Sequence, residues 1–133
     1  MGQPAAKQGD KIVAVDTHII LIPAPPGPPV PTPLPHPFSG IIDSQCSTNV
    51  QIQGMPAATV GSMASNTPPH IPQGGPFQIP PTNKGNIIMG STTVLINNKP
   101  AARMGDTAMT CNDPVPLPIG KVVVAGTPTV LIG

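Results

Sequence analysis

Apolar and polar residues follow one another along this chain in short stretches, with the two-residue period of β-strands. The longest stretch runs from Lys11 to Ile22, is rich in Val and Ile, and partly alternates with polar residues, which favours a strand. No segment of ten or more residues shows the apolar face of a helix, and prolines interrupt every candidate. The pattern therefore predicts an all-β fold with essentially no helix.

Three further apolar stretches each begin at a glycine, and each is followed by a second apolar stretch. The first members are 40–42, 85–88 and 120–124, and the second members are Thr48–Ile52, Thr92–Ile96 and Thr129–Ile132. Small polar turns separate them: Asp43-Ser44-Gln45, Met89-Gly90-Ser91 and Ala125-Gly126-Thr127. We therefore predict three units, each a pair of short strands around one such turn.

A seven-residue motif, Pro-Ala-Ala-x-x-Gly-Asp, occurs three times. The copies are residues 4–10, 56–62 and 100–106, with Ser62 replacing the final Asp in the second copy. The first copy has no apolar stretch before it, and the last apolar stretch, Thr129–Ile132, has no motif after it. We therefore expect this last strand to precede Pro4 in space and to bring the termini together. Internal repeats indicate repeated structural units. Since a unit of two short strands cannot bury its own apolar face, the three should pack together as a three-sided cone about a pseudothreefold axis.

The proline-rich segment from Pro23 to Pro37 lies outside the repeat. Because proline has no backbone N–H to donate, this segment is expected to stay out of any strand ladder and to form extended, polyproline-like chain. We predict an ordered strap over the surface, tied down by His36. The alternative is a flexible or semi-rigid linker.

Composition excludes several classes of function. The 133 residues indicate one small domain, and a net charge of +1 gives no electrostatic case for nucleic acid or an anionic membrane. Pro and Gly are abundant, with 22 and 14 residues, but charged residues make only 8 %, whereas disordered chains are usually charged. We see no signal-peptide pattern and no run of apolar residues long enough for a membrane helix.

Four nitrogen and sulfur side chains are candidates for a metal site. His18 and His70 follow the first two motifs at the same offset, and Cys111 follows the third, so threefold closure would bring them to one end of the axis. Adding His36 completes a His3Cys set, which satisfies tetrahedral Zn²⁺ and leaves no open position, as in structural sites. Cys46 could replace His36, or could form a disulfide with Cys111, but it precedes a repeat strand and is expected to point into the core. We predict one structural zinc per chain.

Catalysis is not expected. The chain contains no Glu, and a catalytic zinc needs an open coordination position and usually a carboxylate base. Asp10 and Asp106 follow the motif glycines, where a turn-capping role is expected. No phosphate loop or nucleophile elbow is present.

The motif copies, above all Pro100-Ala101-Ala102-Arg103, resemble those of PAAR-repeat proteins, and the resemblance covers nearly all of the chain except residues 23–37. The other copies have Lys7 and Thr59 in place of the arginine. The resemblance implies the spike tip of a contractile injection system, such as type VI secretion or a phage-tail-like particle, with a zinc near the tip. It also implies production in the bacterial cytoplasm, delivery on the particle, and a role in piercing target membranes.

The partner implied by this resemblance is a trimeric VgrG-like or gp5-like spike, capped by one chain that is a monomer by itself. The strands of the repeat are the expected contacts, through backbone pairing and apolar side chains. These partner-binding residues are Val50, Ile52, Val94, Ile96, Val130 and Ile132. The alternative function is an adaptor that docks an effector or other cargo to the spike.

Overall fold

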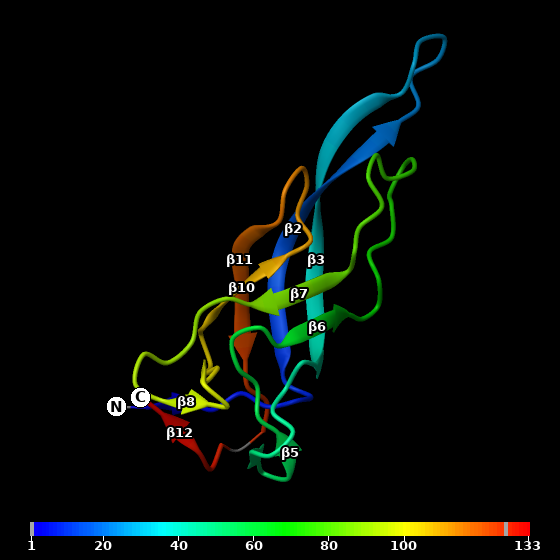
Figure 1. Ribbon diagram of the computed structural model, residues 1–133. Helices are drawn as coiled ribbons and strands as arrows, with labels where there is room; N and C mark the ends of the chain where they lie inside the picture. The colour runs from blue at the N-terminus through cyan, green and yellow to red at the C-terminus, as the bar shows by residue number, and fades with distance from the viewer. Residues whose placement is uncertain (1, 127) are drawn as a thin grey trace.

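The structure, a computed structural model, describes residues 2–126 and 128–133 as an elongated all-β protein (Figure 1). The strands are β1 (Gln3–Pro4), β2 (Lys11–Ile22), β3 (Val30–Ser44), β4 (Gln51–Ile52), β5 (Met55–Pro56), β6 (Met63–Asn66), β7 (Lys84–Ile87), β8 (Leu95–Ile96), β9 (Lys99–Pro100), β10 (Thr107–Thr110), β11 (Leu117–Val123) and β12 (Leu131–Ile132). The predicted fold class is confirmed. Within these two ranges no helix is long and apolar enough to cross a membrane.

Six strands close into an antiparallel barrel in the order β10-β11-β2-β3-β6-β7. Alternate residues point inward, as in β2, where Ile12 and Ile20 are fully buried while Lys11 and Val15 are exposed. Every strand of the barrel contributes to one apolar core, which we call the barrel core. Its members from the strands are Ile12, Phe38, Ile42, Ala64, Ile87, Ala108 and Val122.

Three two-stranded ribbons, β4–β5, β8–β9 and β1–β12, gather at one end of the barrel, together with both ends of the chain (Figure 1). We call this end the base. In the third ribbon, Gln3 pairs with Ile132 and Pro4 with Leu131, so the last strand lies where the repeat requires it. The predicted closure of the ring is confirmed, although Met1 itself lies outside the described residues.

The Ala-Ala pairs of the three motifs form a ring at the centre of the base. Ala6 N donates to Ala102 O, Ala102 N to Ala58 O, and Ala58 N to Ala6 O, each over 3.0 Å. The second alanine of each pair packs into the barrel core, and the first packs into a separate base core with Ile52, Ile96 and Ile132. All six alanines are buried. Three chain segments can meet this closely around one axis only because their side chains are small.

The end of each motif is a tight turn closed by its own side chain. Gly9, Gly61 and Gly105 have φ of 98°, 96° and 87°, a conformation that favours glycine. The next residue accepts the N–H three residues before it: Asp10 from Lys7, Ser62 from Thr59 and Asp106 from Arg103. The predicted capping role of the aspartates is confirmed.

The structure also explains why the second motif ends in serine. Lys7 pairs with Asp10, and Arg103 pairs with Asp106, so each acid stands beside a base in its own copy. In the second copy both members are neutral, because Thr59 faces Ser62. The arginine of the motif therefore forms a pair with the last motif residue, and the other copies replace this pair with Lys and Asp or with Thr and Ser.

The predicted pairing within each unit is wrong. Residues 40–42 belong to barrel strand β3 and residues 85–87 to barrel strand β7, and neither strand pairs with the apolar stretch that follows it. Instead β4 pairs with β5 and β8 with β9 across the two-residue turns Gln53-Gly54 and Asn97-Asn98. All four turn residues have φ between 52° and 81°, as in the type I′ turns that suit hairpins. The third predicted pair fails in the same way, because β11 lies in the barrel and β12 pairs with β1; its predicted turn at 125–127 includes Thr127, which lies outside the described residues.

The proline segment is not a separate strap. Its residues from Val30 onward belong to β3, which pairs residue by residue with β2 from Val30 to Ile41, prolines included. The prolines at 31, 33, 35 and 37 occupy every second position, and a strand's backbone groups point alternately to its two edges. Ser39, of the same parity, bonds to Asn66 and Thr67 on the side away from β2, so the missing N–H groups all fall on the outer edge. The expectation that prolines exclude the segment from a ladder ignored this alternation.

The β2–β3 hairpin extends well beyond the barrel, and the loop between β6 and β7 runs beside it (Figure 1). Leu21 N donates to Pro76 O over 2.9 Å, and Gln78 N donates to Ile19 O over 2.8 Å, which fastens this loop to the free edge of β2. We call residues 17–37 with 67–83 the projecting end.

Candidate functional site

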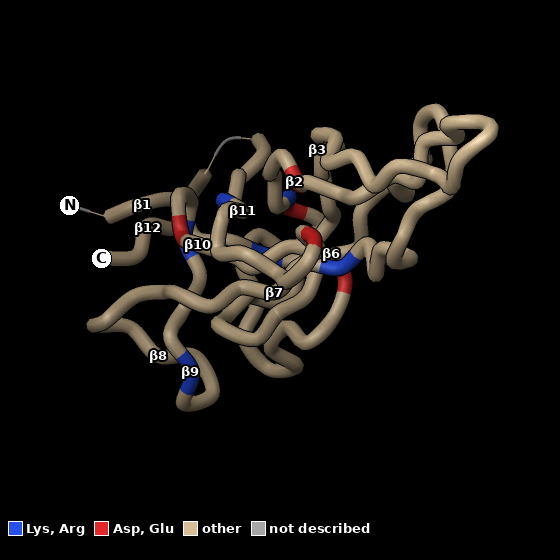
Figure 2. Tube along the Cα trace, turned by 90° about the horizontal axis from the view of Figure 1, so that it is seen from above, with Lys and Arg blue, Asp and Glu red and all other residues tan. Residues whose placement is uncertain are grey.

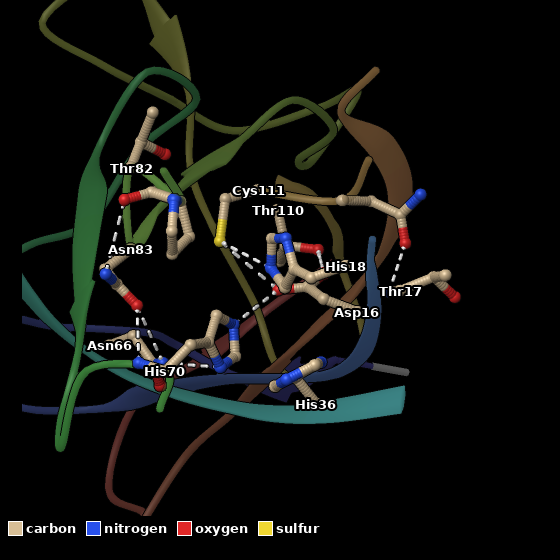
Figure 3. A network of polar contacts seen from close by, with 12 residues as sticks. Asp16, Thr17, His18, His36, Asn66, His70, Thr82, Asn83, Thr110 and Cys111 are labelled. Atoms are coloured by element: carbon tan, nitrogen blue, oxygen red, sulfur yellow. Dashed lines mark hydrogen bonds and ion pairs between the residues drawn. The ribbon is translucent and has the colours of Figure 1, made fainter. Parts of the chain in front are cut away.

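The candidate ligands gather where the projecting end leaves the barrel (Figure 3). Asp16 and His18 lie on the inward face of β2, His36 faces them from β3, His70 lies in the loop after β6, and Cys111 follows β10. The strands β2, β6 and β10 each begin just after a motif, so threefold closure does bring His18, His70 and Cys111 together as predicted.

Four potential ligand atoms lie within 4.8 Å of one another, and they belong to Asp16, His18, His70 and Cys111. His18 Nε2 is 3.7 Å from Cys111 Sγ, and Asp16 Oδ2 is 3.1 Å from His70 Nε2 and 3.4 Å from Cys111 Sγ. This is a group of donors that could hold one metal ion.

His18 is oriented by a hydrogen bond on its far side. Its Nδ1 is 3.2 Å from Asp113 Oδ2, which leaves Nε2 directed at Cys111. A carboxylate behind a histidine fixes the ring and raises its basicity toward a metal, and such partners are common around metal-binding histidines.

His36 belongs to the site but not to the tight group of four. Its ring centroid is 5.3 Å from that of His18 and 5.5 Å from that of His70. Its Nδ1 bonds to Leu34 O over 2.9 Å, while its Nε2 is buried and has no hydrogen-bond partner among the described residues. A buried nitrogen without a partner is costly, and a bound cation would satisfy it.

His70 is held by two asparagines. Asn83 Oδ1 accepts the His70 backbone N–H over 2.8 Å, and Asn66 Nδ2 lies 3.2 Å from His70 Nδ1. Burial lowers the pKa of His70, and the hydrogen bond with Asp16 opposes this shift. A neutral imidazole is the form that binds a metal.

Burial raises the pKa of the Cys111 thiol to about 11, and the negative charge of Asp16 adds to the shift. The thiol therefore stays protonated at neutral pH unless a cation reverses the balance. A bound divalent metal does this, since a coordinating thiol is deprotonated.

Cys46 is not part of this site. It packs against the barrel core, its Sγ lies 3.7 Å from Ser44 O, and both it and Cys111 are free thiols. The alternative in which Cys46 replaces His36 has no geometric support, and neither has the disulfide.

Sequence reasoning missed Asp16. The sequence could have revealed it through the alternation of inward and outward residues along β2. Asp16 falls on the buried face of this strand, together with Ile12, His18 and Ile20. An acid on the inward face of an apolar strand is unusual enough to mark a site.

The base contains the predicted partner contacts, but only part of that set is accessible. Ile52, Ile96 and Ile132 are buried in the base core, so their side chains cannot meet a partner. This corrects the predicted set, and the reason is the inward alternation of these short strands. Val50 and Val130 are exposed, and Val94 is partly buried against the base core. The most exposed apolar side chains here, Leu95 and Leu131, were missed.

A sequence profile described as PAAR motif matches the chain over residues 34–115 and again over 78–133, which together are more than half of its length. A search of curated proteins gave no match.

Proposed function

Because the chain belongs to the family of proteins with the PAAR motif, we propose that it is the tip of the spike of a contractile injection system. In this role one chain caps the blunt end of a trimeric, VgrG-like spike and sharpens it for passage through a target membrane. The chain is made in the bacterial cytoplasm and leaves on the particle.

The observation that carries this proposal is the threefold base. A single chain presents three ribbons of the same backbone geometry around the alanine ring, and a trimer presents three equivalent edges. The corresponding contacts repeat in all three copies: Ala5 N donates to Val130 O, Ala57 N to Val50 O and Ala101 N to Val94 O, over 2.9 to 3.0 Å. Each ribbon can therefore meet one partner subunit in the same way.

The lack of charged residues at the opposite end supports a piercing role. Residues 17–42 and 62–83 contain no Lys, Arg, Asp or Glu. Figure 2 shows the charged residues confined to the barrel and the base, away from the projecting end. A surface without charge loses little hydration free energy on entering a bilayer, since charged groups are the costliest to transfer.

The metal in this proposal is a structural zinc, held by His18, His36, His70 and Cys111. Its support is the chemistry of the donors and the unpartnered Nε2 of His36. The bound ion would join β2, β3 and the loops after β6 and β10 at the root of the projecting end. We propose a mechanical and not a catalytic role, in which the zinc stiffens the tip.

The test is capping of a separately purified trimeric spike. We expect one chain per trimer, by light scattering or cryo-microscopy, with little change between low and high salt because the contacts are apolar and backbone. Leu131→Glu should abolish capping, and Val94→Glu should weaken it, with the metal content unchanged.

Val15→Glu is the matched control, because Val15 and Leu131 are equally exposed at 61 % but Val15 lies on the barrel. It should cap normally. Three chains per trimer, or no complex at any salt concentration, would reject the tip assignment. Capture of effector proteins by a chain that does not cap the spike would instead support the adaptor.

A further inference from the structure

Asp16 is a buried carboxylate with no permanently charged base beside it. It is fully buried, and no lysine or arginine in the part of the chain that the structure describes forms an ion pair with it. Burying a carboxylate without a compensating positive charge is strongly unfavourable. The site around it therefore calls for a cation.

Three side chains lie within hydrogen-bonding reach of this carboxylate. Thr110 Oγ1 donates to Oδ1, while Cys111 Sγ and His70 Nε2 share Oδ2 at 3.4 and 3.1 Å. Two of the three are also candidate ligands of the metal. A thiolate has no hydrogen, and a histidine nitrogen that binds a metal has none either. Once Cys111 and His70 bind an ion, Oδ2 has lost both of these donors, and the ion can take their place.

The spacing of the atoms fits such a contact. Ligand bonds to zinc of about 2.0 to 2.3 Å place neighbouring ligand atoms roughly 3 to 3.7 Å apart. Three of the six distances within the group, from Oδ2 to His70 Nε2, from Oδ2 to Cys111 Sγ and from Sγ to His18 Nε2, are 3.1, 3.4 and 3.7 Å, and all six are within 4.8 Å. Asp16 Oδ2 thus stands where a ligand atom would stand.

The charges favour the same contact. A divalent ion bound by neutral histidines and one thiolate keeps a net charge of +1 in a buried site. The carboxylate of Asp16 offsets this charge at the ion itself, while Asp113, the other buried carboxylate beside the site, lies behind His18 at 3.2 Å from its Nδ1.

We propose that Asp16 Oδ2 is a ligand of the metal, in addition to His18, His36, His70 and Cys111. This rests on the metal site of the proposed function and adds to it an oxygen ligand and a fifth donor. Thr110 then has a supporting role, since its hydroxyl holds Oδ1 and orients Oδ2 toward the ion.

The direct test is a crystal structure of the full chain loaded with zinc, with the ion located by anomalous scattering. We expect Asp16 Oδ2 at a bonding distance of about 2.0 to 2.2 Å. A zinc ion on the histidines and Cys111 with Oδ2 more than about 3 Å away would overturn this proposal and leave the zinc site standing. Absence of stoichiometric metal by elemental analysis would overturn both.

Cobalt substitution gives an independent measurement in solution. We expect Asp16→Asn to weaken Co²⁺ binding by at least about tenfold. Because four-coordinate Co²⁺ absorbs visible light more strongly than five-coordinate Co²⁺, its d–d bands should also gain intensity while the thiolate-to-cobalt band persists. Asp43→Asn, at an exposed acid of β3, is the control and should change neither property. Weaker binding with an unchanged d–d spectrum would mean that Asp16 only positions other ligands.

Discussion

The base and the projecting end of the same chain differ in symmetry and in the interactions that hold them together. The base repeats a single backbone geometry three times and is held by main-chain hydrogen bonds around the alanine ring. The projecting end is not repeated, because the hairpin β2–β3 is much longer than its counterparts β6–β7 and β10–β11 in the other two repeats. The symmetric part is constrained at every copy, while the asymmetric part is free to carry a metal site and a long, uncharged hairpin.

This difference shows how a single chain can join a threefold partner to an asymmetric function. Main-chain contacts depend little on side-chain identity, so the copies can diverge where Lys7, Thr59 and Arg103 stand and still present the same ribbon. The metal ligands need particular side chains, and the three repeats do not supply the same set, since two give a histidine and the third gives Cys111. The comparison can be tested by disturbing each end separately.

The largest effect is expected from removing Thr129–Gly133. This deletion takes away β12, the partner of β1, and with it the buried Ile132. The free energy of unfolding should fall on the order of 5 kcal/mol, which approaches the whole stability of a small domain. Thermal and urea denaturation would measure it. Removing five exposed residues of the β2–β3 turn, 24–28, is the control and should cost far less.

Removal of the metal should act on the other end. Zinc at about a thousand times its Kd stabilises the folded state by about 4 kcal/mol, and a chelator should abolish this. Hydrogen exchange should then quicken in residues 17–37 and 67–83, while the amides of the alanine ring remain protected. Uniform loss of protection at both ends would show that the two regions are not separable.

Overpacking the ring should have a smaller effect. Ala58 is fully buried where three chain segments meet, so Ala58→Leu should destabilise the protein by about 1 to 3 kcal/mol. Capping of the spike should be lost together with stability, because the base is distorted. Ala24→Leu, at an exposed position of the β2–β3 turn, should be neutral in both assays. A neutral Ala58→Leu would mean that the ring tolerates larger side chains.

The smallest effect on stability is expected from replacing Pro31, Pro33 and Pro35 with threonine. The new N–H groups appear on the outer edge of β3, so pairing with β2 is kept and stability should change by less than about 1 kcal/mol. Self-association should rise, since that edge can now pair with another strand. Sedimentation of the triple variant against Val30→Thr, which adds no N–H group, would show this. Equal monomer content would mean that the prolines do not protect the edge.

The threefold closure could be predicted from sequence because it depends only on the numbers of motifs and of strands that precede them. Three motifs with only two preceding strands require the last strand to serve the first motif, and β12 does so. The ligands His18 and His70 were found in the same way, from their equal offsets after the first two motifs, and Cys111 from its place after the third. Repetition carries information that single residues do not.

Other features could not be predicted because they depend on geometry across the fold. Whether a proline disrupts a strand depends on which edge its nitrogen faces, and only the pairing with β2 decides that. β4 and β8 each pair with the next strand because Gln53 and Asn97 begin their turns with a positive φ. Neither residue is glycine, so the sequence did not mark these turns. The part played by Asp16 emerges only once Thr110, Cys111 and His70 are seen around it.

The third ribbon is formed by β1 and β12, from the two ends of the chain, and this has a consequence for the topology. Ile132 and Gln3 pair at the position where the paired strands of the other two ribbons are joined by a two-residue turn. Joining them by such a turn and opening the chain between Asn97 and Asn98 would give a circular permutant with the same ring and the same barrel. Which repeat counts as first is then a matter of genetic order, and the folded molecule itself has no preferred starting point around its axis.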